Sequence, residues 1–318
     1  MEQARTTKQK VLAVLVVAGL FIFIGVLFTG IGIVNHNETV KLQEKVKKQT
    51  EERHINEKLG QLSFSNFTFA KSPKSYLAVV QYKDQTKNLL NFNSTSTLPI
   101  ASLTKLMTAL VAIENLDLTQ KFVAKPEFVG GDGTFNNLTI DEMYKARDLL
   151  SAMLIGSDND SARLLTSGIG EDNFAQLMNA KARELGLTNT SYVNVTGLDP
   201  LDGSPIVNIS SAKDLASLIF YIKEKHPEIL KITQNREFNL CNLKQECKLV
   251  LSTNKLYTDP TFKMPILGGK TGQTDLALKN LALITEPIND IFLVTIVLGS
   301  QDHFTDTKTI FSNLNIKK

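Results

Sequence analysis

The chain has 318 residues, of which 42% are hydrophobic, and a formal net charge of +3 at pH 7. This length and apolar content suffice for one large core or two modest ones. The positive charges form no long basic blocks, so the composition gives no sign of nucleic-acid binding. The four histidines and two cysteines do not cluster with metal-ligand spacing, and we therefore expect neither a metal site nor a cofactor.

The N-terminal region predicts a membrane anchor. Residues 11–34 form a run of 24 residues without a charge, which is long enough to cross a hydrocarbon core of about 30 Å. A cleaved signal peptide has a shorter apolar region of about 7–15 residues. We therefore expect an uncleaved anchor, with residues 1–10 as a cytoplasmic tail, although lysines on both sides leave the positive-inside rule undecided. Residues 35–61 are rich in Glu, Lys and Gln and predict a charged stalk or loose linker.

Residues 62–318 are expected to form the globular domain. Residues 76–82 and 88–93 predict a hairpin, and an apolar helix follows from Ser102. Residues 141–154, 171–185 and 211–225 have helical periodicity. A second hairpin is predicted from residues 279–286 and 291–299, and a last helix from residues 306–314. Strands at both ends with helices between them predict an α+β fold: an antiparallel sheet flanked by helices with an inserted helical lobe, and an active site in the cleft between them.

The two cysteines lie on either side of a short turn. Cys241 follows one strand-like segment, and Cys247 begins the next. Opposed cysteines on a hairpin can bridge when their Cα atoms come within about 7 Å. A disulfide would indicate an oxidising, extracytoplasmic compartment. Two buried thiols are the alternative, because connectivity cannot be read from sequence alone.

One serine and one lysine stand out on the apolar helix. The spacing Ser-x-x-Lys occurs at Ser102 with Lys105, Ser210 with Lys213, and Ser252 with Lys255. Lys105 is the only charge between Ser102 and Ile113, and residues three apart share a helix face. A lone buried amine is costly unless it is neutral or paired, although a lysine reaching the surface is the plain alternative. Ser210 lies before a capping box and Ser252 after a strand-like segment, so neither is the predicted nucleophile.

Two further motifs complete a catalytic set. Ser157, Asp158 and Asn159 precede Lys270, Thr271 and Gly272 in the chain. Together with the first motif they supply what a serine enzyme that opens amide or β-lactam bonds needs: a nucleophile with its amine, a Ser/Asn pair that shuttles a proton, and a strand that holds the substrate. The predicted catalytic residues are Ser102, Lys105, Ser157 and Asn159. The predicted substrate-binding residues are Lys270, Thr271, Gly272, Gln273 and Thr274.

The stretches around these motifs, residues 99–110, 154–160 and 268–275, resemble the D-alanyl-D-alanine carboxypeptidase family, the low-molecular-mass penicillin-binding proteins. Residues 174–190, 197–199 and 298–302 are similar to the same family outside the motifs. The similarity spans roughly residues 70–314 and implies the β-lactamase/transpeptidase-like fold. It also implies a bacterial cell-wall setting, with peptidoglycan stem peptides as substrate and β-lactam antibiotics as covalent inhibitors. Lys255 stands where an arginine is common, which leaves its role open.

The resemblance implies a D,D-carboxypeptidase on the outer side of the bacterial cytoplasmic membrane. Ser102 would be acylated by the D-Ala-D-Ala bond with Lys105 as its base, which requires a neutral amine. Lys270 would stay cationic and bind the substrate carboxylate, and the N–H groups of Ser102 and Gln273 would form the oxyanion hole. Alternatives are a D,D-endopeptidase on cross-linked peptides, a serine β-lactamase, and a membrane-anchored β-lactam or muropeptide sensor without turnover.

Overall fold

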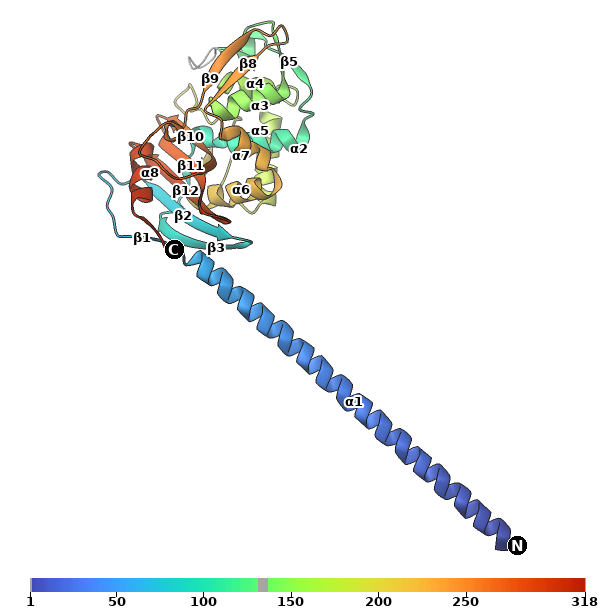
Figure 1. The fold of residues 1–318 in the computed structure, drawn as a ribbon. Coiled ribbons are helices and arrows are strands. Elements are labelled where there is room, and N and C mark those ends of the chain that lie inside the picture. Colours follow the sequence, from blue (N-terminus) through green and yellow to red (C-terminus); the bar gives the residue numbers. More distant parts are fainter. Residues whose placement is uncertain (1, 131–136, 318) are drawn as a thin grey trace. The chain divides into compact units, whose positions relative to one another are not determined.

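The computed structural model describes residues 2–130 and 137–317, and within residues 2–37 it describes only some of the side chains. The chain divides into two compact units, Met1–Glu57 and Lys58–Lys318. The first unit is helical: helix α1 runs from Glu2 to Leu59 (Figure 1). Its last turns consist largely of Glu, Lys and Gln, which favour helix, and the helix ends before Gly60.

Membrane crossing was predicted for residues 11–34, and most side chains of this run lie outside the described ones. No helix within the described part of the chain combines the length and the apolar character that crossing a membrane requires.

The second unit is organised around a five-stranded antiparallel sheet with the strand order β10-β11-β12-β2-β3. The strands are β2 (Ser75–Tyr82), β3 (Gln85–Phe92), β10 (Ile266–Thr274), β11 (Leu278–Ile288) and β12 (Ile291–Ser300). Both predicted hairpins are thereby confirmed. The central strand β12 is buried at nearly every position, because both faces of the sheet are covered and its apolar run therefore does not alternate with polar residues.

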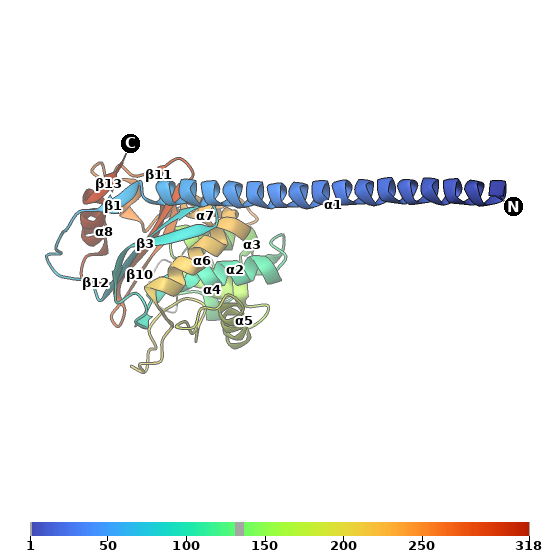
Figure 2. The same ribbon diagram turned by 90° about the horizontal axis from the view of Figure 1, so that it is seen from below.

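Helices cover both faces of this sheet. On strand β11, Ala282 and Ile284 join the main core, whereas Leu281 and Leu283 join a smaller core on the other face. Helix α6 (Ala212–Lys225) packs against β12 and β2, and α8 (His303–Ser312) packs against β12 and β11. Figures 1 and 2 show these two helices on opposite sides of the sheet.

A helical lobe is inserted between β3 and β10, as the sequence predicts. Its helices are α2 (Lys105–Asn115), α3 (Ala146–Ile155), α4 (Asn159–Thr166), α5 (Glu171–Glu184) and α7 (Pro227–Thr233). Its short helical turns are η1 (Ala101–Thr104), η2 (Pro126–Phe128) and η3 (Lys255–Tyr257). Small antiparallel pairs complete the unit: β1 (Leu62–Phe64) with β13 (Leu314–Ile316), β4 (Leu98–Pro99) with β7 (Ile209–Ser210), β5 (Lys121–Val123) with β6 (Met143–Lys145), and β8 (Glu237–Cys241) with β9 (Cys247–Leu251).

Two predicted helices begin at other residues than expected. The helix expected from residue 141 begins at Ala146, because the preceding residues pair as strand β6 with β5. The helix expected from residue 306 begins at His303, because the Asp302 side chain accepts a hydrogen bond from the Thr305 backbone at 3.2 Å and caps it. It ends at Ser312, since the following residues form strand β13.

The predicted disulfide is present. Cys241 and Cys247 face each other at the end of the β8–β9 hairpin, with their Cα atoms 4.0 Å apart. The tip of this hairpin is tied to the rest of the lobe, because the Leu243 backbone donates a 2.9 Å hydrogen bond to the Met143 carbonyl.

Candidate active site

Ser102 lies on a tight turn rather than on a regular helix. It belongs to the 3-10 turn η1, which continues directly into α2 at Lys105. The turn starts from a strained backbone, since Ala101 has a φ of 48°. The Ile100 backbone N–H donates a 3.1 Å hydrogen bond to the Asn208 carbonyl and so ties the entry of the turn to the neighbouring segment. The Ser102 side chain remains half-buried and lines a cleft.

Lys105 lies one turn further on and is completely buried, with 0% of its surface exposed. Its Nζ lies 2.9 Å from Ser102 Oγ, 2.7 Å from Asn159 Oδ1 and 2.6 Å from the Thr196 carbonyl oxygen. Of these three groups, only the serine hydroxyl can also donate a proton. A neutral amine that gives its two hydrogens to the amide and carbonyl oxygens therefore directs its lone pair at Ser102. This geometry favours a base over a lysine that reaches the surface.

Ser157 lies in a second tight turn, between α3 and α4, and Asn159 begins α4. Ser157 has a φ of 61°, a left-handed conformation that is rare for residues other than glycine. Asp158 caps α4 by accepting a 2.7 Å hydrogen bond from the Ser161 backbone, so its carboxylate has a structural role here. Asn159, the first residue of α4, is thereby placed with its side-chain oxygen on Lys105.

Lys270 lies on strand β10 and is also almost fully buried, with 1% exposed. Its Nζ donates hydrogen bonds to Ser157 Oγ at 2.8 Å and to the Thr271 carbonyl at 3.0 Å. Burial lowers the pKa of Lys270 to about 7, because the charged form loses its water of hydration. The sequence predicts a cation that binds the substrate carboxylate, and this role stays a prediction; in the structure the amine contacts the Ser157 hydroxyl.

Gly272 allows β10 to lie directly against the nucleophile turn. A Cβ atom at Gly272 would lie 2.7 Å from the Ile100 carbonyl oxygen and 3.0 Å from the Ser102 nitrogen, which is too close for any other residue. This approach brings Gln273, the next residue of β10, to the same cleft as Ser102. It is the arrangement that a two-amide oxyanion hole requires.

The site opens into a cleft of about 1110 Å³. Ser102, Ser157, Asn159 and residues 271–274 line its catalytic end, and residues 249–253 of strand β9 and the loop after it form one wall. The cleft continues to a far arm at the start of α8. The residues that line this arm are Asp259, Asp302, His303, Phe304, Thr305 and Lys308, and Lys279, the strand partner of Gln273, also lines the cleft.

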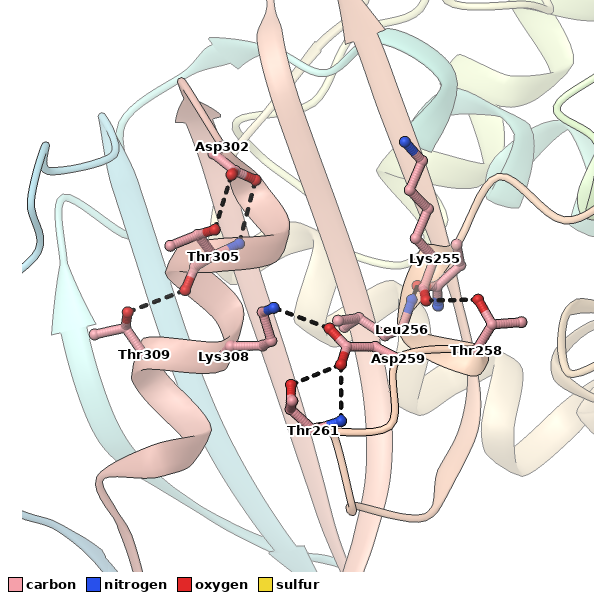
Figure 3. A network of polar contacts seen from close by, with 10 residues as sticks. Lys255, Leu256, Thr258, Asp259, Thr261, Asp302, Thr305, Lys308 and Thr309 are labelled. Atoms are coloured by element: carbon pink, nitrogen blue, oxygen red, sulfur yellow. Dashed lines mark hydrogen bonds and ion pairs between the residues drawn. The ribbon is translucent and has the colours of Figure 1, made fainter.

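The far arm is held together by polar contacts between α8 and the loop after β9. Lys308 donates to the Asp259 carboxylate at 2.9 Å, and Asp259 also accepts from the backbone and hydroxyl of Thr261. Lys255 lines the cleft too, and Figure 3 shows its side chain pointing away from the Asp259–Lys308 pair.

The structure brings together every site residue that the sequence predicts. Hydrogen bonds join Lys105 to Ser102 and Asn159, and a separate hydrogen bond joins Lys270 to Ser157. Of the other strand residues, Thr271 bonds through its hydroxyl to Thr253, and Thr274 accepts from the Ala277 backbone at 3.2 Å.

Sequence reasoning missed the Thr196 carbonyl, which is a backbone group and leaves no signature in residue types. It also missed Thr253, whose hydroxyl contacts Thr271. His303 at the far arm was seen only as a scattered histidine, although burial lowers its pKa to about 4. Its place beside the cleft depends on the packing of α8, which the spacing of histidines cannot reveal.

Comparison with known proteins decides the family. A model of the D-alanyl-D-alanine carboxypeptidase family matches residues 66–302. The chain belongs to the D-alanyl-D-alanine carboxypeptidase family. The class of enzyme that the three motifs predict, a serine-type D-alanyl-D-alanine carboxypeptidase, is thereby confirmed.

Relatives within this family carry two kinds of name. A D-alanyl-D-alanine endopeptidase of Pseudomonas aeruginosa is 31% identical over 238 residues, which cover 72% of this chain and 73% of that protein. The D-alanyl-D-alanine carboxypeptidase DacF of Bacillus subtilis is 33% identical over 204 residues, which cover 62% of this chain and only 50% of DacF.

Solved structures confirm the penicillin-binding-protein fold. A D-alanyl-D-alanine carboxypeptidase of Mycobacterium tuberculosis superimposes with a TM-score of 0.66 at 26% identity, covering 79% of this chain and 94% of that one. Penicillin-binding protein D2 of Listeria monocytogenes, in its ampicillin-bound form, superimposes with a TM-score of 0.64 at 28% identity, covering 78% of this chain and 98% of that one.

Proposed function

We propose that this protein is a membrane-anchored serine D,D-carboxypeptidase that removes the terminal D-alanine from peptidoglycan stem pentapeptides through an acyl-enzyme. The observation that carries the proposal is the Lys105 amine, 2.9 Å from Ser102 Oγ and held on its other side by Asn159 and the Thr196 carbonyl. A serine is a weak nucleophile until an adjacent base takes its proton, and this arrangement supplies that base.

In the proposed acylation, the neutral Lys105 amine takes the hydroxyl proton of Ser102 as Oγ attacks the carbonyl carbon of the penultimate D-alanine. The backbone N–H groups of Ser102 and Gln273 donate to the oxyanion that forms. The C–N bond then breaks as the proton that Lys105 took passes to the leaving amine through the Ser157 hydroxyl, which Lys270 holds at 2.8 Å; Lys105 is neutral again. D-Alanine departs, water attacks the ester, and hydrolysis returns a proton to Ser102.

The same geometry supports acylation of Ser102 by β-lactam antibiotics. A β-lactam presents a strained amide carbonyl where the substrate presents its D-Ala-D-Ala bond, so the same nucleophile, base and oxyanion donors would act on it. The likeness to the Listeria protein solved in ampicillin-bound and cefotaxime-bound forms supports this proposal.

The proposed location is the bacterial cytoplasmic membrane, with the catalytic unit on its outer side. The uncharged run of residues 11–34 supports a single N-terminal anchor. The Cys241–Cys247 disulfide supports the outer side, because disulfides persist in oxidising compartments. Protease treatment of intact spheroplasts tests it: residues 58–318 should be digested from outside, whereas protection of these residues would contradict the proposed orientation.

The test of the activity is release of D-alanine from a muramyl pentapeptide. We expect Ser102→Ala to lower this rate by about 10³-fold or more, since loss of a nucleophile removes the acyl-enzyme route. Ser217→Ala, an exposed position on α6, is the matched control and should keep the wild-type rate. D-Alanine release by Ser102→Ala at the wild-type rate would show that the nucleophile is another group.

A second candidate activity is D,D-endopeptidase cleavage of cross-links. The cleft extends past Thr274 to the far arm at α8, which leaves room for a leaving group longer than one amino acid, and several relatives are named endopeptidases. Mass spectrometry of muropeptides after treatment with the protein separates the two. Loss of pentapeptides with constant dimers supports the carboxypeptidase, whereas a fall in dimers supports the endopeptidase.

A further inference from the structure

Asn208 joins the nucleophile turn to the segment that contacts Lys105. It is buried, with 1% exposed, and lies outside the three catalytic motifs. On the side of the turn, its carbonyl accepts from the Ile100 backbone at 3.1 Å, and its Nδ2 donates to Thr104 Oγ1 at 2.9 Å. The Thr104 hydroxyl in turn donates to the Ala101 carbonyl at 2.7 Å. The turn that carries Ser102 is therefore bonded to Asn208 at both ends, through the Ile100 backbone at its start and the Thr104 side chain at its end.

The other contacts of Asn208 hold residues 193–197. Its Oδ1 accepts from the backbone N–H groups of Val193 at 2.7 Å and Asn194 at 3.1 Å, and its Nδ2 also donates to the Asn194 carbonyl at 2.9 Å. The Asn194 side chain then accepts from the backbones of Thr196 at 3.1 Å and Gly197 at 2.6 Å. Such a bond from a side chain to the backbone two residues on forms a compact turn, and this turn presents the Thr196 carbonyl.

The segment also packs directly on the nucleophile turn. Gly197 has a φ of +85°, and a Cβ atom there would lie 2.0 Å from the Ala101 carbonyl oxygen. Only glycine satisfies both the backbone conformation and the available space. The position of the Thr196 carbonyl relative to Ser102 is therefore set by contacts across this junction.

We propose that Asn208 is a positioning residue for the Ser102–Lys105 pair. By bonding the nucleophile turn and residues 193–197 at once, it fixes the Thr196 carbonyl at 2.6 Å from Lys105 Nζ. That carbonyl takes one N–H of the amine, Asn159 Oδ1 takes another, and the lone pair then faces the Ser102 hydroxyl. Asn208 touches neither substrate nor the reacting atoms, and it acts through the Thr196 carbonyl. The inference rests on the proposed reaction at Ser102.

The experiment measures acylation of the full chain by a fluorescent penicillin in stopped flow, which separates the dissociation constant of the initial complex from the acylation rate constant. We expect Asn208→Ala to lower the rate constant about 10- to 100-fold, the range expected when reacting groups are displaced by up to 1 Å. The dissociation constant should change less than threefold, because the cleft surface is intact. Asn208→Ala that acylates within twofold of wild type would overturn the proposal.

Asn179→Ala is the matched control. The Asn179 side chain holds the start of the same segment, donating to the Tyr192 carbonyl at 2.7 Å and accepting from its N–H at 2.9 Å. It lies on α5 rather than at the nucleophile turn, so its loss should lower the melting temperature and leave the acylation rate constant within twofold. If both asparagine variants lose acylation in proportion to their melting temperatures, the role of Asn208 is structural and the proposal is wrong.

Thr104 provides a second pair of variants if Asn208→Ala does not fold. Thr104→Ser keeps the hydroxyl between Asn208 and Ala101, whereas Thr104→Val removes it at nearly constant volume. We expect the serine variant to acylate near the wild-type rate and the valine variant at least tenfold slower. Equal rates would overturn the proposal. Acylation of Ser102→Ala would instead refute the proposed function, whatever the Asn208 and Thr104 variants do.

Discussion

Replacement of Lys270 by methionine should change how the stability of the fold depends on pH. Burial lowers the pKa of Lys270 from 10.5 to about 7. Between these values the unfolded chain holds the proton and the folded chain does not, so the free energy of unfolding rises with pH. The slope approaches about 1.4 kcal/mol per pH unit. Between pH 7 and 9 the free energy of unfolding of wild type should therefore rise by about 2 kcal/mol relative to that of Lys270→Met.

Urea unfolding at pH 7, 8 and 9 measures this gain. Tyrosine fluorescence is the suitable probe, because the chain has six tyrosines and no tryptophan and tyrosine ionises only near pH 10. Lys87→Met on the exposed edge strand β3 is the control, and its difference from wild type should stay constant over the same range. A difference between wild type and Lys270→Met that is also constant, or that shrinks as the pH rises, would refute the argument from burial.

Three further predictions concern the site. Lys105→Arg should acylate far more slowly than Lys270→Arg with a fluorescent penicillin, because arginine cannot give up its proton; equal rates or the reverse order would assign the base to the wrong lysine. Gly272→Ala should lower the free energy of unfolding by about 1–3 kcal/mol through overpacking against the nucleophile turn, and should also lower the acylation rate. A Cβ atom at Gly168 would only reach ordinary contact distance, 3.9 Å from Phe122, so Gly168→Ala should change neither the melting temperature nor the acylation rate. Burial lowers the pKa of His303 to about 4, so protonation favours the unfolded chain. Between pH 7 and 4.5 the free energy of unfolding of wild type should therefore fall by about 2 kcal/mol relative to that of His303→Asn. A difference from urea unfolding that is the same at both pH values would contradict this.

The elements with strong local signals could be predicted from the sequence. The hairpins that end in β3 and β12 have apolar strands separated by polar turns, and the helix α6 has Ser211 at its N-cap, where the side chain accepts from the Asp214 backbone at 3.1 Å. The Ser102–Lys105 pair was predicted because the spacing of residues on a helix is fixed. Short strands such as β6 and β13 escaped prediction, because three-residue pairings depend on distant partners rather than on local pattern.

The prediction for Lys270 shows where motif reasoning reaches its limit. Its place beside Ser157 follows from the motifs, but its burial does not, because that depends on how the helical lobe covers β10. Only 1% of the Lys270 surface is exposed, and its amine contacts the Ser157 hydroxyl, which lines the cleft. The role of Lys270 in binding the substrate carboxylate therefore stays a prediction, and Lys255 and Lys279 are further cations that line the cleft.

The burial of Lys270 also affects its protonation state near neutral pH. A carboxylate beside a buried amine would hold the proton on it, whereas burial without such a partner releases the proton near neutral pH. For Lys270 burial is the cause that lowers the pKa, and the described hydrogen bonds of the amine end on a hydroxyl and a carbonyl oxygen. Near pH 7 the amine therefore exists in both forms, so it can accept a proton from the Ser157 hydroxyl or donate one to it. In the proposed reaction this exchange would serve proton transfer to the leaving amine. The burial that allows it lowers the stability of the fold, which Lys270→Met should recover at pH 7.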